Sequence, residues 1–138
     1  VTDSKGCTDD ETVTIGEPSN VLTALIDSKT DVSCKGDATG SATASATGGT
    51  AGYTYSWNTV PVQTGATATD LKTGTYTVTV TDSKGCTDDE TVTIGEPSNV
   101  LTALIDSKTD VSCKGDATGS ATASATGGTA GYTYSWNT

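Results

Sequence analysis

The chain repeats itself: residues 1–59 recur letter for letter as residues 80–138, which sets a period of 79 residues. This length is too long for the small solenoid repeats and suits one small globular domain per period. Val1 begins inside a strand-like pattern, so we expect the chain to be a window on a longer array. We predict one complete domain at residues 21–97. The end of a preceding repeat, at residues 1–20, comes before it, and the first half of a following one, at residues 98–138, comes after.

Alternation of apolar and polar residues with period two predicts short strands within each period. Residues 41–47 place alanines on one face, and residues 53–57 place three aromatic side chains on one face. We expect a first strand over residues 21–26 and 30–34, with a kink at 27–29, and further strands at residues 66–71, 75–82 and 91–94. Gly- and Asp-containing turns separate them, and the two GEPSN segments, at residues 16–20 and 95–99, are predicted linkers. Seven or so strands in fewer than 80 residues are typical of a β-sandwich.

The core of such a sandwich is expected to be thin. Only 33% of the residues are hydrophobic, and the chain contains no Phe and no Met. An alanine-faced strand opposite an aromatic-faced one allows large side chains to pack against small ones. Trp57 is the predicted central residue, and Tyr76 fits a tyrosine corner, in which the hydroxyl bonds to upstream backbone. Tyr53 and Tyr55 are the alternative candidates for stacking on a sugar.

The four cysteines, Cys7, Cys34, Cys86 and Cys113, occur two per period, with no CxxC spacing and no His. This pattern favours disulfides, and therefore an oxidising compartment, over a zinc site. A Cys34–Cys86 bridge within the complete repeat is one prediction. This internal bridge is the preferred prediction, although sandwich topology would separate those two turns by about 20 Å. The alternative is a bridge from the Cys34-type turn of one repeat to the Cys86-type hairpin of the next. A Cys7–Cys34 pair is the least expected.

Charge limits the partners and the chemistry. The 17 acidic residues and 7 lysines give a net charge of −10, which argues against binding nucleic acid or anionic membranes. No apolar run is long enough for a membrane span. Without His, no Ser-His or Cys-His pair can form, so we predict that the protein is not an enzyme. We expect no cofactor; calcium bound by Asp82, Asp88, Asp89 and Glu90 is the alternative to a solvated acidic face.

Residues 32–57 and 74–94 together resemble the SprB-type repeat of giant surface adhesins of gliding bacteria. The shared pattern is Cys-x-Gly-x-x-x-Gly, then Gly-Gly before Tyr-x-Tyr-x-Trp, then Gly-Thr-Tyr-x-Val-x-Val-x-Asp-x-x-Gly-Cys. The matching residues are Cys34, Gly36, Gly40, Gly48, Gly49, Tyr53, Tyr55, Trp57, Gly74, Tyr76, Asp82, Gly85 and Cys86. Gly52 departs from the pattern, since a Pro often stands there.

The resemblance implies an immunoglobulin-like antiparallel β-sandwich in tandem head-to-tail repeats, exported to the bacterial cell surface. It implies a role in filaments, adhesion or gliding motility, and it implies no ligand. We therefore predict a structural or adhesive module that acts by reach, stiffness and multivalency. Its expected partners are neighbouring identical repeats, other filament copies and surface polysaccharide. The alternative is a carbohydrate-binding module that uses Tyr53 and Tyr55.

Overall fold

The computed structural model describes residues 1–137, which form eight strands and no helix. The strands are β1 (Thr23–Thr30), β2 (Gly40–Thr47), β3 (Thr54–Trp57), β4 (Thr67–Leu71), β5 (Gly74–Thr81), β6 (Thr87–Ile94), β7 (Thr102–Thr109) and β8 (Ser120–Thr126). No helix among residues 1–137 is long and apolar enough to cross a membrane.

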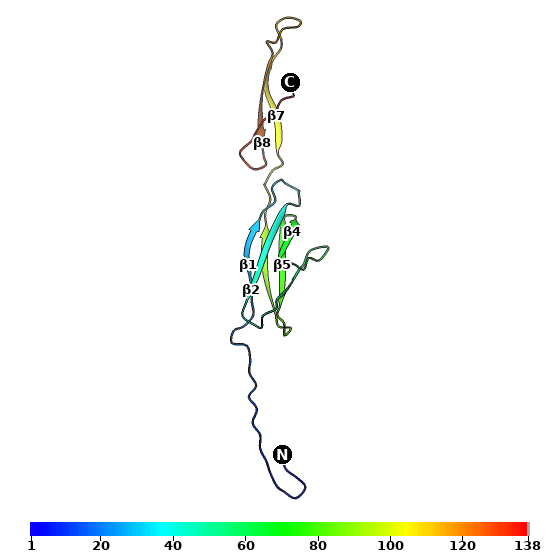
Figure 1. Ribbon diagram of the computed structural model, residues 1–138. Coiled ribbons are helices and arrows are strands. Elements are labelled where there is room, and N and C mark those ends of the chain that lie inside the picture. Colours follow the sequence, from blue (N-terminus) through cyan, green and yellow to red (C-terminus); the bar gives the residue numbers. More distant parts are fainter. Residues whose placement is uncertain (138) are drawn as a thin grey trace.

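Strands β1 to β6 build one sandwich. One antiparallel sheet has the order β1-β2-β4 and the other β3-β5-β6, and β7 and β8 form a separate two-stranded sheet (Figure 1). The prediction of an all-β antiparallel sandwich is confirmed. Apart from Leu71 on β4, the core residues on the strands of the first sheet are small: Ala24, Ala42, Ala44 and Ala68. The second contributes Trp57, Val78, Val80 and Ile94, so large side chains pack against small ones as the alternation predicted.

The sandwich has six strands, where about seven were expected. The first strand ends at Thr30 and not at residue 34, because residues 31–39 form a loop between β1 and β2. Val32 is buried there, and its backbone N–H donates to the carbonyl of Gly95, 2.9 Å away. The Val32 side chain enters the core from a loop. A buried apolar residue among polar neighbours is also the pattern of a strand, which is why the sequence predicted a strand at residues 30–34. The kink expected at residues 27–29 is a β-bulge, where the pairing with β2 shifts between Ile26 and Ser28.

The remaining residues extend beyond the two ends of the sandwich (Figure 1). Residues 1–20 contain one isolated bridge, between Thr2 and Thr8. Strands β7 and β8 pair in the same register as β1 and β2, with the bulge at the equivalent place.

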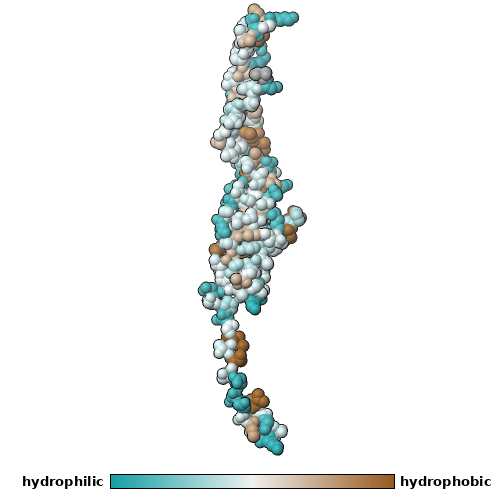
Figure 2. All heavy atoms as spheres, in the orientation of Figure 1, coloured by the Kyte–Doolittle hydropathy of each residue, from teal (hydrophilic) through white to brown (hydrophobic). Residues whose placement is uncertain are grey.

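Identical sequences are buried in one copy and exposed in the other. Ile94 is 0% exposed in the sandwich, whereas Ile15, its equivalent one period earlier, is 86% exposed. Figure 2 shows such hydrophobic side chains standing out along the thin N-terminal segment. Burial of these residues therefore requires the other strands of the same repeat, which residues 1–20 lack.

Candidate functional site

No two cysteines of the chain form a disulfide. Cys34 lies in the loop between β1 and β2, whereas Cys86 lies in the turn between β5 and β6, at the opposite end of the sandwich. All four cysteines are free and exposed. The prediction of an internal Cys34–Cys86 disulfide is therefore wrong. The reason is topological: β6 returns to the end where Gly95 pairs with Val32, and this leaves the β5–β6 turn at the other end.

At the end that carries Cys34, the β1–β2 loop holds the outgoing linker. The carboxylate of Asp31 accepts the N–H of Gly95 at 2.8 Å, and the N–H of Gly36 donates to Glu96 Oε2 at 2.8 Å. The Lys35 ammonium donates to the carbonyl of Ser98. The hydrogen bond from Gly95, followed by that from the Lys29 ammonium, lowers the pKa of Asp31. The linker is thus tied to the repeat that it leaves.

Asp82 organises the opposite end of the sandwich. Its Oδ2 accepts the N–H of Thr50 at 2.8 Å, and its Oδ1 accepts those of Lys84 and Cys86, each at 2.9 Å. These donors, Thr50 foremost, lower the pKa of Asp82. The carboxylate therefore joins the β5–β6 turn to the loop at residues 48–52. The DSKG sequence signals the local turn, since Asp often accepts backbone N–H groups two residues on, but it does not reveal the bond to Thr50.

The other proposed calcium ligands point to different surroundings. Asp88 Oδ2 accepts the N–H of Ala24 at 2.8 Å, which links β6 to β1 across the two sheets. Asp89 lies between Asp88 and Glu90 on β6, so its side chain projects to the other face of the strand. Among residues 1–137, no group of three or more His, Cys, Asp or Glu is arranged to hold a metal ion. That the protein binds no cofactor stays a prediction, with calcium as its alternative.

The aromatic residues pack in or against the sandwich core and bond to its backbone. Trp57 is buried, and its Nε1–H donates to the carbonyl of Gly65 at 3.0 Å. The Tyr76 hydroxyl donates to the carbonyl of Lys72 at 3.1 Å, which is the geometry of a tyrosine corner. Tyr53 and Tyr55 are half-buried against the core, and the Tyr53 hydroxyl donates to the carbonyl of Gly48 at 2.6 Å.

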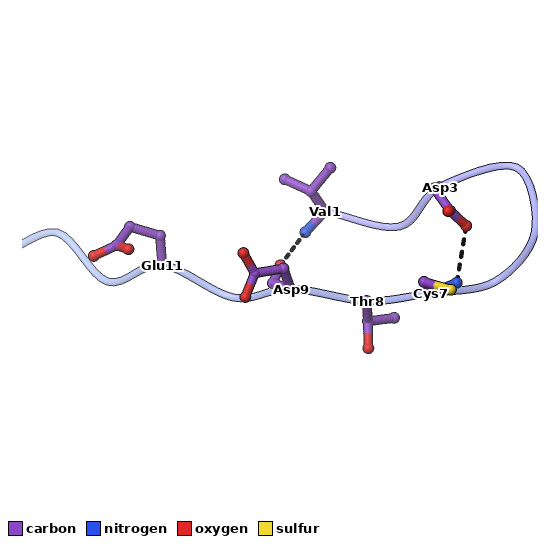
Figure 3. Close-up of a pocket in the computed structure, with 6 residues that line it drawn as sticks. All are labelled: Val1, Asp3, Cys7, Thr8, Asp9 and Glu11. Atoms are coloured by element: carbon purple, nitrogen blue, oxygen red, sulfur yellow. Dashed lines mark hydrogen bonds between the residues drawn. The ribbon is translucent and has the colours of Figure 1, made fainter.

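The surface hollows are shallow and open. One, of about 450 Å³, lies within the turn of the N-terminal segment (Figure 3). There the N-terminal ammonium donates to the carbonyl of Asp9, and Asp3 accepts the N–H of Cys7. The carboxylate of Glu11 lies apart from both, and the chain has no His to serve as a base.

A second hollow, of about 420 Å³, lies at the end where the incoming linker meets the sandwich. It is lined by Glu17, Pro18, Ser19, Asn20, Val21, Leu22, Gly49, Cys86, Thr87 and Asp88. Two backbone segments approach closely here, because a Cβ on Gly48 would lie 2.0 Å from the carbonyl oxygen of Val21. Only glycine fits there, which gives a structural reason for the Gly-Gly pair. We call this hollow the junction groove.

Comparison with known proteins identifies one family. No curated protein and no solved structure matches the chain. The SprB repeat family matches residues 26–62 and again residues 105–138, which together make up just over half of the chain. The two matches begin one period apart, at β1 and at β7. The chain therefore belongs to the SprB repeat family.

Proposed function

We propose that the chain is a structural and adhesive module of an extracellular surface filament, stacked head to tail with identical neighbours. Membership of the SprB repeat family suggests a cell-surface repeat module and supports this proposal. The exact 79-residue repeat supports it further, because each added period would lengthen the array by the same unit.

The linker between β6 and β7 is the observation that carries the proposal. Its start is tied to the sandwich through Gly95, Glu96 and Ser98. Its end is tied to the β7–β8 hairpin, because the N–H of Gly128 donates to the carbonyl of Asn99 at 2.8 Å. Gly95, Glu96 and Ser98 bond to the preceding sandwich and Asn99 to the following hairpin, which supports a stiff rod over beads on a flexible string.

Stiffness and charge act together in such a filament. Each strand of eight residues is about 26 Å long at ~3.3 Å per residue, so every period adds at least that much reach. The net charge of −10 keeps neighbouring filaments apart and soluble. Many identical copies then allow weak contacts with surface polysaccharide, or with other filaments, to add up through multivalency.

Small-angle X-ray scattering on chains of two, four and eight periods tests the mechanical part of the proposal. The maximum dimension should grow linearly with the number of periods, whereas a flexible string would grow as about the square root. Antibodies against residues 21–97 should label intact cells that produce the parent protein. Square-root growth, or labelling only after the cells are broken open, would contradict the proposal.

Carbohydrate binding through Tyr53 and Tyr55 is the weaker proposal, because both rings are already half covered and the Tyr53 hydroxyl is bonded inside the repeat. A glycan array distinguishes the two functions. Saturable binding that Tyr53→Ala removes, with the β-sheet circular dichroism unchanged, would favour the carbohydrate-binding module.

A further inference from the structure

The GEPSNVL linker occurs twice in the described chain, once before the sandwich and once after it. Residues 16–22 show how a linker joins the repeat that follows it. Residues 95–101 show how a linker joins the repeat that precedes it. Each copy therefore displays one side of the same repeat–repeat junction.

The two copies have the same local geometry, so the two sides can be combined. The N–H of Gly49 donates to the carbonyl of Asn20 at 2.9 Å, and the N–H of Gly128 donates to that of Asn99 at 2.8 Å. A Cβ on Gly48 would lie 2.0 Å from the oxygen of Val21, and one on Gly127 would lie 2.1 Å from that of Val100. The linker enters its following repeat in the same way both times.

Combining the outgoing and incoming halves of the junction brings the β1–β2 loop of one repeat close to the β5–β6 turn of the next. On the outgoing linker, Gly36 and Lys35 contact Glu96 and Ser98. The equivalents of these two linker residues on the incoming side, Glu17 and Ser19, line the junction groove together with Cys86. A preceding repeat that holds Glu17 and Ser19 in the observed way must therefore present its own β1–β2 loop at the groove of the next repeat.

We propose that residues 33–37 of each repeat dock into the junction groove of the following repeat and place Cys34 beside that repeat's copy of Cys86. The inference rests on the proposed function, because it requires consecutive complete repeats. The linker bonds favour this occupant, because Gly36 and Lys35 hold Glu96 and Ser98, whose equivalents Glu17 and Ser19 line the groove. The loop carries both Lys35 and Asp37, and Lys35 is the one of the two that the carboxylates of Glu17 and Asp88 attract. The exposure of Cys34 and Cys86 at opposite ends of one sandwich agrees with each lying at a different junction.

Cysteine cross-linking tests the docking. The chain continued after Thr138 by a second copy of residues 60–138 contains two complete sandwiches. The test chain retains only Cys34 and the second sandwich's copy of Cys86, with serine at the other cysteines. Oxidised glutathione takes up the two electrons of the thiols and becomes two glutathione molecules. The protein forms one S–S bond, and its intact mass falls by two hydrogens.

The matched control retains Cys34 and Cys86 of the first sandwich, which lie in loops at opposite ends. We expect the intramolecular cross-link to form at least tenfold faster in the test chain than in the control. Lys35→Glu should reduce the rate severalfold while the circular dichroism stays that of the parent chain. Equal rates in test and control chains would overturn the proposal, as would a Lys35→Glu variant that cross-links at the full rate.

Failure of the docking and failure of the proposed function give different results. A chain that scatters as a rod and labels on intact cells but does not cross-link refutes the docking and leaves the surface role standing. A chain that cross-links but is never labelled on intact cells supports the docking and refutes the surface role.

Discussion

Ile94→Ala tests whether the small core carries the stability of the repeat. Ile94 is fully buried at the end of β6, and its Cγ2 lies 2.6 Å from where a Cβ on Gly40 would be. Because Gly40 has no side chain, nothing on that side can move in to fill the space left by the truncation.

The expected loss follows from the atoms removed. Ile→Ala deletes three carbons, whose burial is worth about 2.4 kcal/mol at ~0.8 kcal/mol each. The cavity left behind adds to this, so we expect the free energy of unfolding to fall by about 3–4 kcal/mol. A sandwich of this size has a total stability of roughly 4–12 kcal/mol, so the variant loses a large fraction of it. Ile94→Val removes one carbon and should cost about 1 kcal/mol.

The chain contains its own control. Ile15→Ala makes the same change in the same local sequence, but Ile15 is 86% exposed, so its cost should stay below about 0.5 kcal/mol. Urea unfolding is followed by the fluorescence of the buried Trp57 in a Trp136→Phe background. With a slope of about 1 kcal/mol per molar, Ile94→Ala should lower the midpoint by roughly 3 M. Equal shifts for the two isoleucines, or a loss below about 1 kcal/mol at Ile94, would refute the reasoning.

Three further predictions concern side chains at the ends of the sandwich. Tyr76→Phe should lower the free energy of unfolding by about 1 kcal/mol in the same urea assay, because it removes the bond to the carbonyl of Lys72; an unchanged midpoint would contradict the tyrosine corner. Folding lowers the pKa of Asp82, so its stabilisation is fully present above the unfolded pKa of about 3.9 and is lost as pH falls through the folded pKa. Thermal melts from pH 7 to 2 should therefore show a smaller acid destabilisation in Asp82→Asn than in the parent. EDTA should leave the melting temperature unchanged, because backbone donors occupy both oxygens of Asp82; a calcium-dependent rise of several degrees would argue for a metal site.

The strand faces were predictable because side-chain alternation is a local property of the β-pleat. The alanines of β2, the aromatic face that ends at Trp57, and the buried valines of β5 all follow from period-two patterns. The resemblance also led to the SprB repeat family, which the comparison confirmed. Local chemistry likewise marked the turns that contain Gly and Asp.

Contacts between distant segments were not predictable in this way. Val32 is buried from a loop through its pairing with Gly95, more than 60 residues away, so a local pattern took the segment for a strand. Asp82 was considered as a calcium ligand, yet it binds the backbone of Thr50 in a different loop. No local signal specifies either partner, because each is set by how the two sheets are joined.

By itself, the sequence determined the period, the faces of the strands and the family, since these depend on residue order and on the pleat. Only the tertiary structure decided which end of the sandwich each loop occupies, and with it that Cys34 and Cys86 of one repeat cannot meet. It also decided which of two identical isoleucines is buried. The physical reason is that burial and loop placement depend on strands contributed from elsewhere in the repeat. Ile15 and Ile94 have the same neighbours in sequence, but only Ile94 has the rest of a sandwich around it.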